Sequence, residues 1–194
     1  MNTAAAEAGL TLVTHLFNAM APLHHRQPGL IGHTLGTEEL TAGLIVDGVH
    51  LAPQVVTLAL RALGPERLVL VSDAVAAMGL GPGTHHLGAR TVTAGPDGVR
   101  RSDGTLAGSD LTLDRAMRNL IDQTGCSLGV AVGAASSNPA RVLGEDDRGR
   151  LEPGAVADVV VLDPSDLRVV ATFCRGHLAH CVDDASWRHQ PVSA

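Results

Sequence analysis

Residues 42–74 read AGLIVDGVHLAPQVVTLALRALGPERLVLVSDA, and this stretch decides the fold that we expect. It begins and ends with continuous apolar runs. Between them lies a helical pattern with Pro53 near its first turn and Gly64 just past its end. Continuous rather than alternating apolar runs are typical of strands buried on both faces of a sheet. Strand, helix and strand in this order predict a parallel β/α unit.

The segments on both sides of this unit also carry strand-like and loop-like sequence patterns. Residues 10–15, LTLVTH, predict an earlier strand, and residues 24–36, which contain glycine and proline, predict a loop after it. Residues 79–108 are rich in glycine, threonine and charged residues, which favours a hairpin or a long loop with a turn at Asp97-Gly98.

Two more helices and a β-rich segment are expected further along. Residues 109–125 return to the helical period, with one apolar stripe made of Leu113, Met117, Leu120 and Ile121. Residues 136–144, SSNPARVLG, predict a helix that is capped by Asn138 and ends at Gly144. Residues 154–164 and 167–180 predict a pair of strands.

The composition limits the function classes. The chain has 194 residues, of which 45% are hydrophobic and 2% aromatic, and its formal net charge is −6. Phosphate backbones attract basic surfaces and unpaired bases stack on aromatic rings, so we expect no nucleic-acid partner. The three scattered cysteines predict reduced thiols, and neither a signal peptide nor a membrane-spanning run is recognisable. We therefore expect a soluble cytoplasmic protein without membrane contact.

Polar side chains stand where the three apolar strands end. The first strand finishes on His15, the second runs through Asp47 to His50, and the third finishes on Asp73. In a parallel β/α architecture the carboxyl ends of the strands converge on one face, which carries the chemistry. Two imidazoles and two carboxylates could there bind a divalent metal ion and move a proton. Hydrogen-bonded loop anchors are the alternative interpretation, and the pattern names no substrate.

Four segments, in order along the chain, carry a resemblance to a known family. They are THLFNAMAPLHHRQPGL (14–30), GLIVDGVHLAP (43–53), LVLVSDAVAAMG (68–79) and GTLAGSDLTLDRAMRNL (104–120). Together they resemble the N-acetylglucosamine-6-phosphate deacetylases of the amidohydrolase superfamily. The resemblance runs from about residue 11 to about residue 176 and so covers most of the chain.

The resemblance implies a fold and a domain organisation. The fold class would be α/β, with about the last three strands of a (β/α)8 TIM-type barrel followed by the C-terminal strands of a small β-sandwich. Residues 1–149 would form the partial barrel, residues 150–182 the sandwich strands and residues 183–194 a tail. A complete barrel typically needs about 250 residues, so the chain resembles the C-terminal half of such an enzyme.

The resemblance also implies roles for individual residues. His15 matches a ligand of a divalent metal ion, zinc or a similar one, and Asp73 matches the catalytic acid/base. Arg26 resembles the arginine that binds the 6-phosphate, in relatives often from the neighbouring subunit of a homodimer. The remaining substrate-binding positions are Asn18, Ala19, Asp47, Gly48, Val49, His50, Leu106, Ala107, Gly108 and Ser109.

The activity implied by the resemblance is hydrolysis of N-acetylglucosamine-6-phosphate to glucosamine-6-phosphate and acetate. In related enzymes a glutamate from an early barrel strand and a second histidine complete the metal site, and neither is recognisable before residue 11. We therefore expect the isolated chain to hold metal poorly and to show little or no deacetylase activity. Two alternatives remain open: a non-catalytic remnant that acts only by assembling with another chain, and an amidohydrolase of different amide specificity.

Overall fold

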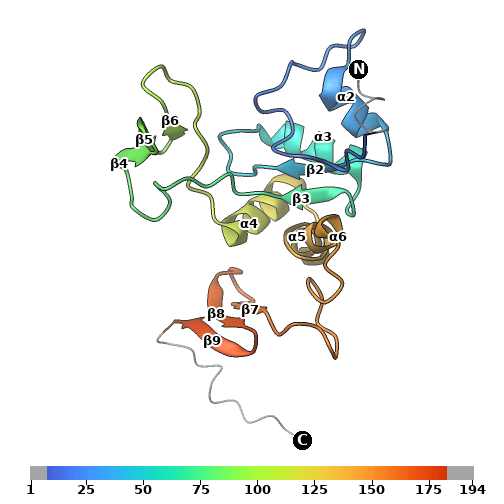
Figure 1. The fold of residues 1–194 in the computed structure, drawn as a ribbon, viewed down its shortest axis with the longest axis vertical. Coiled ribbons are helices and arrows are strands. Elements are labelled where there is room, and N and C mark those ends of the chain that lie inside the picture. Colours follow the sequence, from blue (N-terminus) through green and yellow to red (C-terminus); the bar gives the residue numbers. More distant parts are fainter. Residues whose placement is uncertain (1–7, 183–194) are drawn as a thin grey trace, which may run out of the picture.

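The computed structural model describes residues 8–182, which form three separate three-stranded sheets with helices beside the first (Figure 1). The first sheet is parallel and has the order β1-β2-β3, whereas the other two are antiparallel. Helices α4 (Leu113–Thr124), α5 (Leu128–Ala135) and α6 (Ser137–Leu143) lie between the parallel sheet and the C-terminal sheet, and the sheet formed by residues 83–100 stands to one side (Figure 1). Within this part of the chain, none of the helices has the length and apolar character that a membrane crossing requires.

The parallel sheet confirms the β/α unit that the sequence predicts. Its strands are β1 (Leu12–Val13), β2 (Thr41–Leu44) and β3 (Leu68–Leu70). Ala42 of β2 pairs with Val13 on one side and with Leu68 on the other. The strands are shorter than the apolar runs that predict them, but Ile45 and Val46 stay fully buried beyond the end of β2. The chain therefore reaches the polar residues after β2 along a buried path.

Helix α3 (Pro53–Leu63) connects β2 to β3, as the sequence predicts. Pro53 occupies the first turn, where its missing N–H costs no hydrogen bond. Gly64 ends the helix with a φ of 71°, a conformation that glycine adopts without steric penalty. Val56 and Ala59 are fully buried on the face that packs into the core. Local sequence signals are thus sufficient to define this helix.

Residues 24–36 are not a continuous loop, because α2 (Gly29–Gly36) occupies their second half. The prediction of a loop over the whole range is wrong. Helix propensity did not predict α2, because the segment contains glycine and proline and both are poor helix formers. Ile31 and Thr34 are buried, and the Thr34 hydroxyl donates to the Leu30 carbonyl oxygen at 2.8 Å. Burial of this face against the core outweighs the low propensity.

Helix α4 (Leu113–Thr124) confirms the predicted helical period, and Gly125 ends it in the left-handed conformation. Met117 and Leu120 of the predicted apolar stripe are buried, whereas Leu113 is 42% exposed. The next helix, α5 (Leu128–Ala135), was not predicted from the sequence. Its sequence LGVAVGAA is apolar on all sides, so no helical period distinguishes it.

Helix α6 (Ser137–Leu143) begins earlier than the sequence predicts, and its N-cap is Ser136. The prediction that Asn138 caps this helix is wrong. Asn138 is 4% exposed, and its side-chain amide donates to the carbonyl oxygens of Pro65 at 2.8 Å and Leu68 at 2.7 Å. It therefore satisfies backbone groups at the start of β3 rather than at the start of its own helix. Gly144 ends α6 as predicted.

The core around the parallel sheet is aliphatic, as the scarcity of aromatic residues predicts. It draws on all three strands and on α2 to α5, and its largest fully buried members include Leu16, Leu44, Ile45, Leu68 and Leu120. The β4–β6 sheet has a small core of its own, made of Ala77, Val92, Ala94, Val99 and Ala107.

Residues 83–100 form the antiparallel sheet of β4 (Gly83–Leu87), β5 (Arg90–Gly95) and β6 (Gly98–Arg100). The expected hairpin is confirmed, and Gly95 pairs with Gly98 across the turn that contains Asp97. Gly98 has a φ of 89°, which suits glycine at a tight turn.

The C-terminal sheet has three strands rather than the expected two. They are β7 (Val159–Leu162), β8 (Val169–Cys174) and β9 (His177–Cys181). Arg175 and Gly176 have positive φ, and they turn the chain within the predicted second strand.

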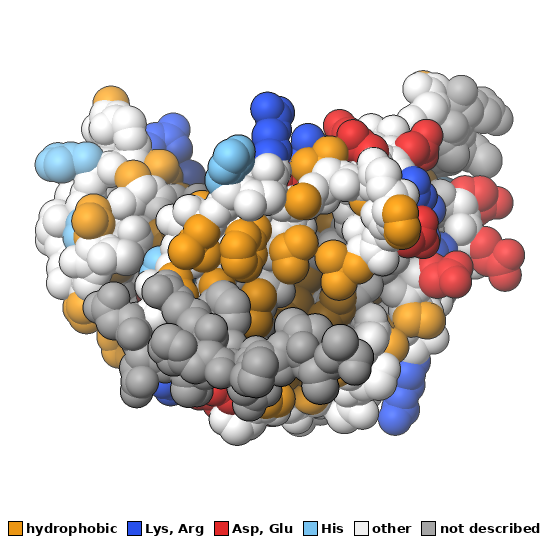
Figure 2. All heavy atoms as spheres, turned by 90° about the horizontal axis from the view of Figure 1, so that it is seen from below, with side chains coloured by type: hydrophobic (Ala, Val, Ile, Leu, Met, Phe, Trp, Pro, Cys, Tyr) orange, Lys and Arg blue, Asp and Glu red, His pale blue; other side chains and the backbone are white. Residues whose placement is uncertain are grey.

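A groove lined mainly by hydrophobic side chains lies between α4, α5 and β7. Figure 2 shows hydrophobic side chains gathered on the face that is seen from below. The predicted tail, residues 183–194, lies outside the described residues.

Candidate functional site

The three parallel strands bring their polar ends to one edge of the sheet. His15 follows β1, Asp47 follows β2 and Asp73 follows β3. Because β1 and β3 both pair with β2, the two outer strands lie roughly 10 Å apart. The structure thus brings the three predicted strand ends together, at the edge where α/β proteins carry their chemistry.

His15 sits in a turn directly after β1 and has a strained backbone, with a φ of 35°. The next residue holds the turn against the sheet, because the Leu16 N–H donates to the Gly43 carbonyl oxygen at 2.8 Å. The imidazole Nδ1 of His15 is buried and has no hydrogen-bond partner within the described chain. Buried polar atoms are normally paired, so an unpaired imidazole nitrogen at a strand end is a candidate metal ligand.

Backbone strain is concentrated at this edge. Within residues 8–182, the non-glycine residues with positive φ are His15, Phe17, Ala19 and Asp73 at the strand ends, and Leu167 and Arg175 in the C-terminal region. Such conformations cost about 1–3 kcal/mol each and persist only where the surrounding structure imposes them. Ala19 and Asn18 belong to the strained turn after β1, and the Asn18 N–H donates to the His15 carbonyl oxygen at 2.9 Å.

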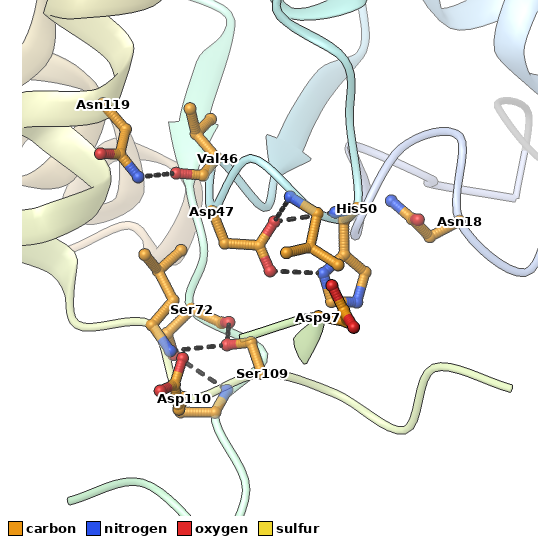
Figure 3. A network of polar contacts seen from close by, with 12 residues as sticks. Asn18, Val46, Asp47, His50, Ser72, Asp97, Ser109, Asp110 and Asn119 are labelled. Carbon is orange, nitrogen blue, oxygen red and sulfur yellow. Dashed lines mark hydrogen bonds and ion pairs between the residues drawn. The ribbon is translucent and has the colours of Figure 1, made fainter. Parts of the chain in front are cut away.

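Asp47 and His50 form a closed pair after β2 (Figure 3). One carboxylate oxygen of Asp47 accepts the N–H groups of Val49 at 2.9 Å and His50 at 2.8 Å. The other oxygen lies 2.7 Å from His50 Nδ1, and the two side chains are only 5% and 4% exposed. Gly48 provides the sharp turn between them, with a φ of 82°.

The environment keeps Asp47 ionised. Burial by itself would raise the pKa of its carboxyl group, but the hydrogen bonds from the His50 ring and from the His50 and Val49 backbone hold the pKa below its ordinary value of 3.8. An ionised carboxylate only accepts hydrogen bonds, so His50 Nδ1 carries the proton in this contact. In the neutral ring Nε2 is then a free acceptor, which suits the recognition of a hydroxyl group.

Asp73 is exposed, with a φ of 49°, and the loop of residues 106–109, which are predicted substrate-binding positions, is joined to it. The Ser109 N–H donates to the Asp73 carbonyl oxygen at 2.8 Å, and the Val75 N–H donates to the Ser109 carbonyl oxygen at 3.0 Å. Gly108 fits closely beneath this junction: a Cβ there would lie 2.7 Å from the Asp73 carbonyl oxygen. The loop therefore continues the parallel pairing beyond the end of β3.

Ser109 takes part in this junction with its side chain as well. Its hydroxyl donates to the Ser72 carbonyl oxygen and accepts the Leu111 N–H at 2.9 Å, and the residue is 1% exposed. This second network is visible beside the Asp47–His50 pair in Figure 3. The Ser109 side chain is thus engaged with backbone groups, and among the predicted loop residues Ala107 is also buried.

Arg26 lies on an exposed loop between β1 and α2. Its Nη1 is 2.7 Å from His25 Nε2, and its backbone N–H donates to the His24 ring at 3.3 Å. The rings of His24 and His25 are 4.4 Å apart between centroids. The structure therefore groups Arg26 with two imidazoles on this loop.

The residues present fit only part of a metal centre. Within residues 8–182, no three His, Cys, Asp or Glu side chains are grouped so that they could hold a metal ion. His15 offers one ligand nitrogen, whereas structural and catalytic zinc sites use at least three protein ligands. The described residues therefore do not complete a metal site by themselves.

Two contacts at the site were not predicted from the sequence. The Asn119 side-chain amide, on α4, donates to the Val46 carbonyl oxygen at 2.7 Å, directly before Asp47 (Figure 3). Ser72 contributes its carbonyl oxygen to the Ser109 hydroxyl. Both acceptors are backbone groups, which leave no mark in the sequence. Asn119 is one of several polar residues on α4, so its identity alone did not distinguish it in the sequence.

Comparisons with known proteins agree with this arrangement. The sequence pattern of the Amidohydrolase family matches residues 1–184. The N-acetylglucosamine-6-phosphate deacetylase of Bos taurus is 45% identical over 191 residues, covering 93% of this chain and 46% of the relative. The deacetylase of that name from Bacillus subtilis is 40% identical over 182 residues, with coverages of 93% and 46%. The chain thus spans about half the length of these curated relatives.

Solved structures show the same relationship. The crystal structure of N-acetylglucosamine-6-phosphate deacetylase from Thermotoga maritima has a TM-score of 0.89 at 38% identity, covering 93% of this chain and 50% of that one. A mutant of the Mycobacterium smegmatis deacetylase, in complex with N-acetyl-D-glucosamine-6-phosphate, has a TM-score of 0.85 at 39% identity, with coverages of 90% and 47%. From the match over residues 1–184 and the strand ends that carry its polar residues, we conclude that this chain belongs to the amidohydrolase family.

Proposed function

We propose that this chain carries part of the active site of a divalent-metal-dependent N-acetylglucosamine-6-phosphate deacetylase. The observation that supports the proposal most directly is the single sheet edge that holds His15, the Asp47–His50 pair and Asp73. Relatives of that name are 40–45% identical over more than nine-tenths of this chain. The parallel strands would be the last three of a (β/α)8 barrel, and residues 150–182 would belong to an accessory β-sandwich.

Asp73 would act as the general acid/base of the hydrolysis. Water adds to the acetamide carbonyl carbon and gives a proton to the Asp73 carboxylate. Asp73 then returns this proton to the nitrogen as the C–N bond breaks, which yields the amine and acetate. The exposed position of Asp73 leaves its carboxylate accessible to a substrate. The hydrogen bond from Ser109 fixes the Asp73 backbone without occupying the carboxylate.

His50 and its neighbours would orient the sugar. The Asp47 carboxylate holds the His50 ring at Nδ1, which leaves Nε2 to accept a hydroxyl of the sugar. The turn that carries Asn18 and Ala19, and the backbone of Gly48 and Val49, border the same edge. Residues 106–109 would close over the sugar mainly with backbone groups, because the Ser109 hydroxyl is already engaged.

Arg26 would bind the 6-phosphate. Its exposed guanidinium can pair with two phosphate oxygens at once, and its loop extends away from the parallel sheet (Figure 1). We propose that this arginine serves the site of a second subunit in a homodimer. Replacement of Arg26 by alanine would then weaken phosphate-dependent binding without changing the stability of the protein.

His15 would supply one ligand of the metal ion. A divalent ion polarises a carbonyl group and acidifies water when bound. Because residues 8–182 offer His15 without a full set of ligands, the ion would need further ligands from outside this part of the chain. We therefore expect the isolated 194-residue chain to show little or no turnover of N-acetylglucosamine-6-phosphate.

A hybrid protein tests the proposed function. This chain would replace the matching 46% of the Bacillus subtilis relative, whose remaining part would supply what the chain lacks. We expect the hybrid to release glucosamine-6-phosphate and acetate, and the Asp73→Asn hybrid to be inactive but folded. A folded, metal-loaded hybrid without turnover would contradict the proposal. A hybrid that prefers acetamido sugars lacking the phosphate would favour an amidohydrolase of different amide specificity.

One observation favours the alternative of a non-catalytic chain that works by assembly. Leu113, Val132 and Val160 line the hydrophobic groove and are 42%, 40% and 54% exposed. Exposed apolar surface of this kind marks contact sites. The molar mass of the isolated chain in solution distinguishes a non-catalytic assembling chain from part of a deacetylase. A stable oligomer without bound metal and without turnover supports the non-catalytic alternative.

A further inference from the structure

We propose that Asn119 is a positioning residue for His50 and that it acts through the backbone of Val46. The Asn119 side-chain amide donates to the Val46 carbonyl oxygen at 2.7 Å, and it reaches this segment just after β2 from a helix 73 residues later in the chain. Val46 is fully buried and directly precedes Asp47. Asn119 therefore attaches α4 to the point where the Asp47–His50 turn leaves the sheet (Figure 3). The catalytic consequence of this contact rests on the proposed deacetylase function, but the positioning itself does not.

The turn by itself does not determine where the His50 ring lies relative to the sheet. All three hydrogen bonds to the Asp47 carboxylate come from Val49 and His50, which are two and three residues away. These local bonds define the internal shape of the turn. A rigid turn can still tilt at its ends, so its orientation depends on what holds the backbone before and after it.

Each end of the turn has a different anchor. Leu51, which follows His50, is held by burial, with 4% exposure. Val49 contacts the tip of the β5–β6 hairpin, since a Cβ on Gly98 would lie 3.1 Å from Val49 Cγ1. These contacts are apolar and non-directional. The hydrogen bond from Asn119, in contrast, is directional. It holds the backbone of Val46, and the position of this backbone determines where the Asp47 side chain lies.

Loss of this bond has a definite expected effect. Without Asn119 the Val46 carbonyl oxygen is buried without this donor, and the backbone is expected to shift toward another donor or water. The shift would carry Asp47 and the His50 ring with it. Because His50 would orient the bound sugar, its displacement would weaken substrate binding more than it slows the chemical step.

The first test uses the full chain and needs no turnover. We would compare Asn119→Leu, which keeps the size but removes the donor, with Asn119→Asp, which presents a carboxylate to the carbonyl oxygen. The control is Asp122→Asn, an exposed carboxylate-to-amide change on the same helix. Hydrogen exchange of the Val49 and His50 amides reports the turn. Exchange of the Val71 amide, which donates to Leu44 at 3.1 Å, reports the sheet.

We expect both Asn119 variants to raise exchange of the Val49 and His50 amides about tenfold, with Val71 changed less than twofold. The ¹⁵N resonances of the His50 ring should shift in the same variants and stay in place in the Asp122→Asn control. Unchanged Val49 and His50 amides would overturn the proposal. Equal acceleration at Val71 would also overturn it, because Asn119 would then support the fold as a whole.

The second test uses the hybrid described above and separates the two proposals. We expect Asn119→Leu to raise the KM of the hybrid about tenfold and to change kcat less than threefold, because His50 would orient the bound sugar. A fall in soluble yield with unchanged KM and kcat would overturn the positioning role. A folded, metal-loaded parent hybrid without turnover would contradict the deacetylase function and leave the exchange measurements on the isolated chain to decide the role of Asn119.

Discussion

The Ser109 N–H donates to the carbonyl oxygen of Asp73 at 2.8 Å, and it thereby joins a loop from the far end of the β4–β6 insertion to the end of β3. The Ser109 hydroxyl repeats the connection one residue earlier, at the carbonyl oxygen of Ser72. The backbone of the proposed catalytic carboxylate is thus held by a segment distant in sequence. Its side chain remains free, as a group that must accept and return a proton requires.

Gly108→Ala should destabilise this junction strongly. Gly108 has a φ of 93°, and an added Cβ would lie 2.7 Å from the Asp73 carbonyl oxygen and 2.6 Å from Val75 Cγ1. We expect the free energy of unfolding, measured in urea, to fall by about 3 kcal/mol. Gly104→Ala is the matched control, because Gly104 has a φ of 83° with open space around it. It should lose only about 1 kcal/mol, and equal losses would show that the close approach to Asp73 is unimportant.

Asp73→Asn should leave the fold intact and abolish hydrolysis in the hybrid protein. Asparagine tolerates the left-handed backbone conformation that Asp73 adopts, at a φ of 49°, and the side chain is exposed. We expect stability within about 0.5 kcal/mol of the parent and a fall in kcat of about 10²–10⁴-fold. Asp122→Asn is the control for an exposed aspartate. Retention of full turnover by the Asp73 variant would remove Asp73 from the mechanism.

The Asp47–His50 pair should make stability depend on pH in a predictable direction. The pKa of Asp47 lies below its ordinary value of 3.8 in the folded chain. The ionised carboxylate therefore contributes stability at pH values above 3.8, and this contribution is lost as the pH falls through the lower, folded-state pKa. Asp47→Asn should be less stable than the parent at about pH 6, and the difference should narrow at about pH 3. Urea unfolding of both proteins measures the difference, and a gap independent of pH would contradict the ionised pair.

Metal retention by the isolated chain should be weak and should depend on His15. One imidazole holds a divalent ion poorly, because affinity requires several ligands with fixed geometry. We expect less than one equivalent of zinc after gel filtration, measured by elemental analysis, and a further decrease in His15→Asn. His86→Asn, on the exposed face of β4, is the matched control and should change nothing. One tightly held equivalent in the His15 variant would show that the ion binds elsewhere.

Several parts of the fold followed from local sequence alone. Helix α3 was predicted with both ends, since Pro53 and Gly64 mark them, and β3 was recognised from its continuous apolar run. Helix α2 was not predicted because its glycines interrupt the helical period of apolar residues. Helix α5 was not predicted because its sequence is apolar on every side. In both cases burial against the core stabilises the helix. Burial depends on the elements that pack against the segment, and the sequence of the segment alone does not reveal them.

The sequence by itself determined that apolar strands would alternate with helices and that polar residues would follow each strand, because periodicity and turn residues act within a few positions of the chain. Only the tertiary structure decided that residues 106–109 would pair beside Asp73 and that Asn119 would reach Val46. These contacts end on backbone carbonyl oxygens, which every residue has. A pattern of side chains in the sequence therefore cannot predict which carbonyl oxygen accepts each hydrogen bond. The acceptor is determined by how elements distant in the sequence pack against one another.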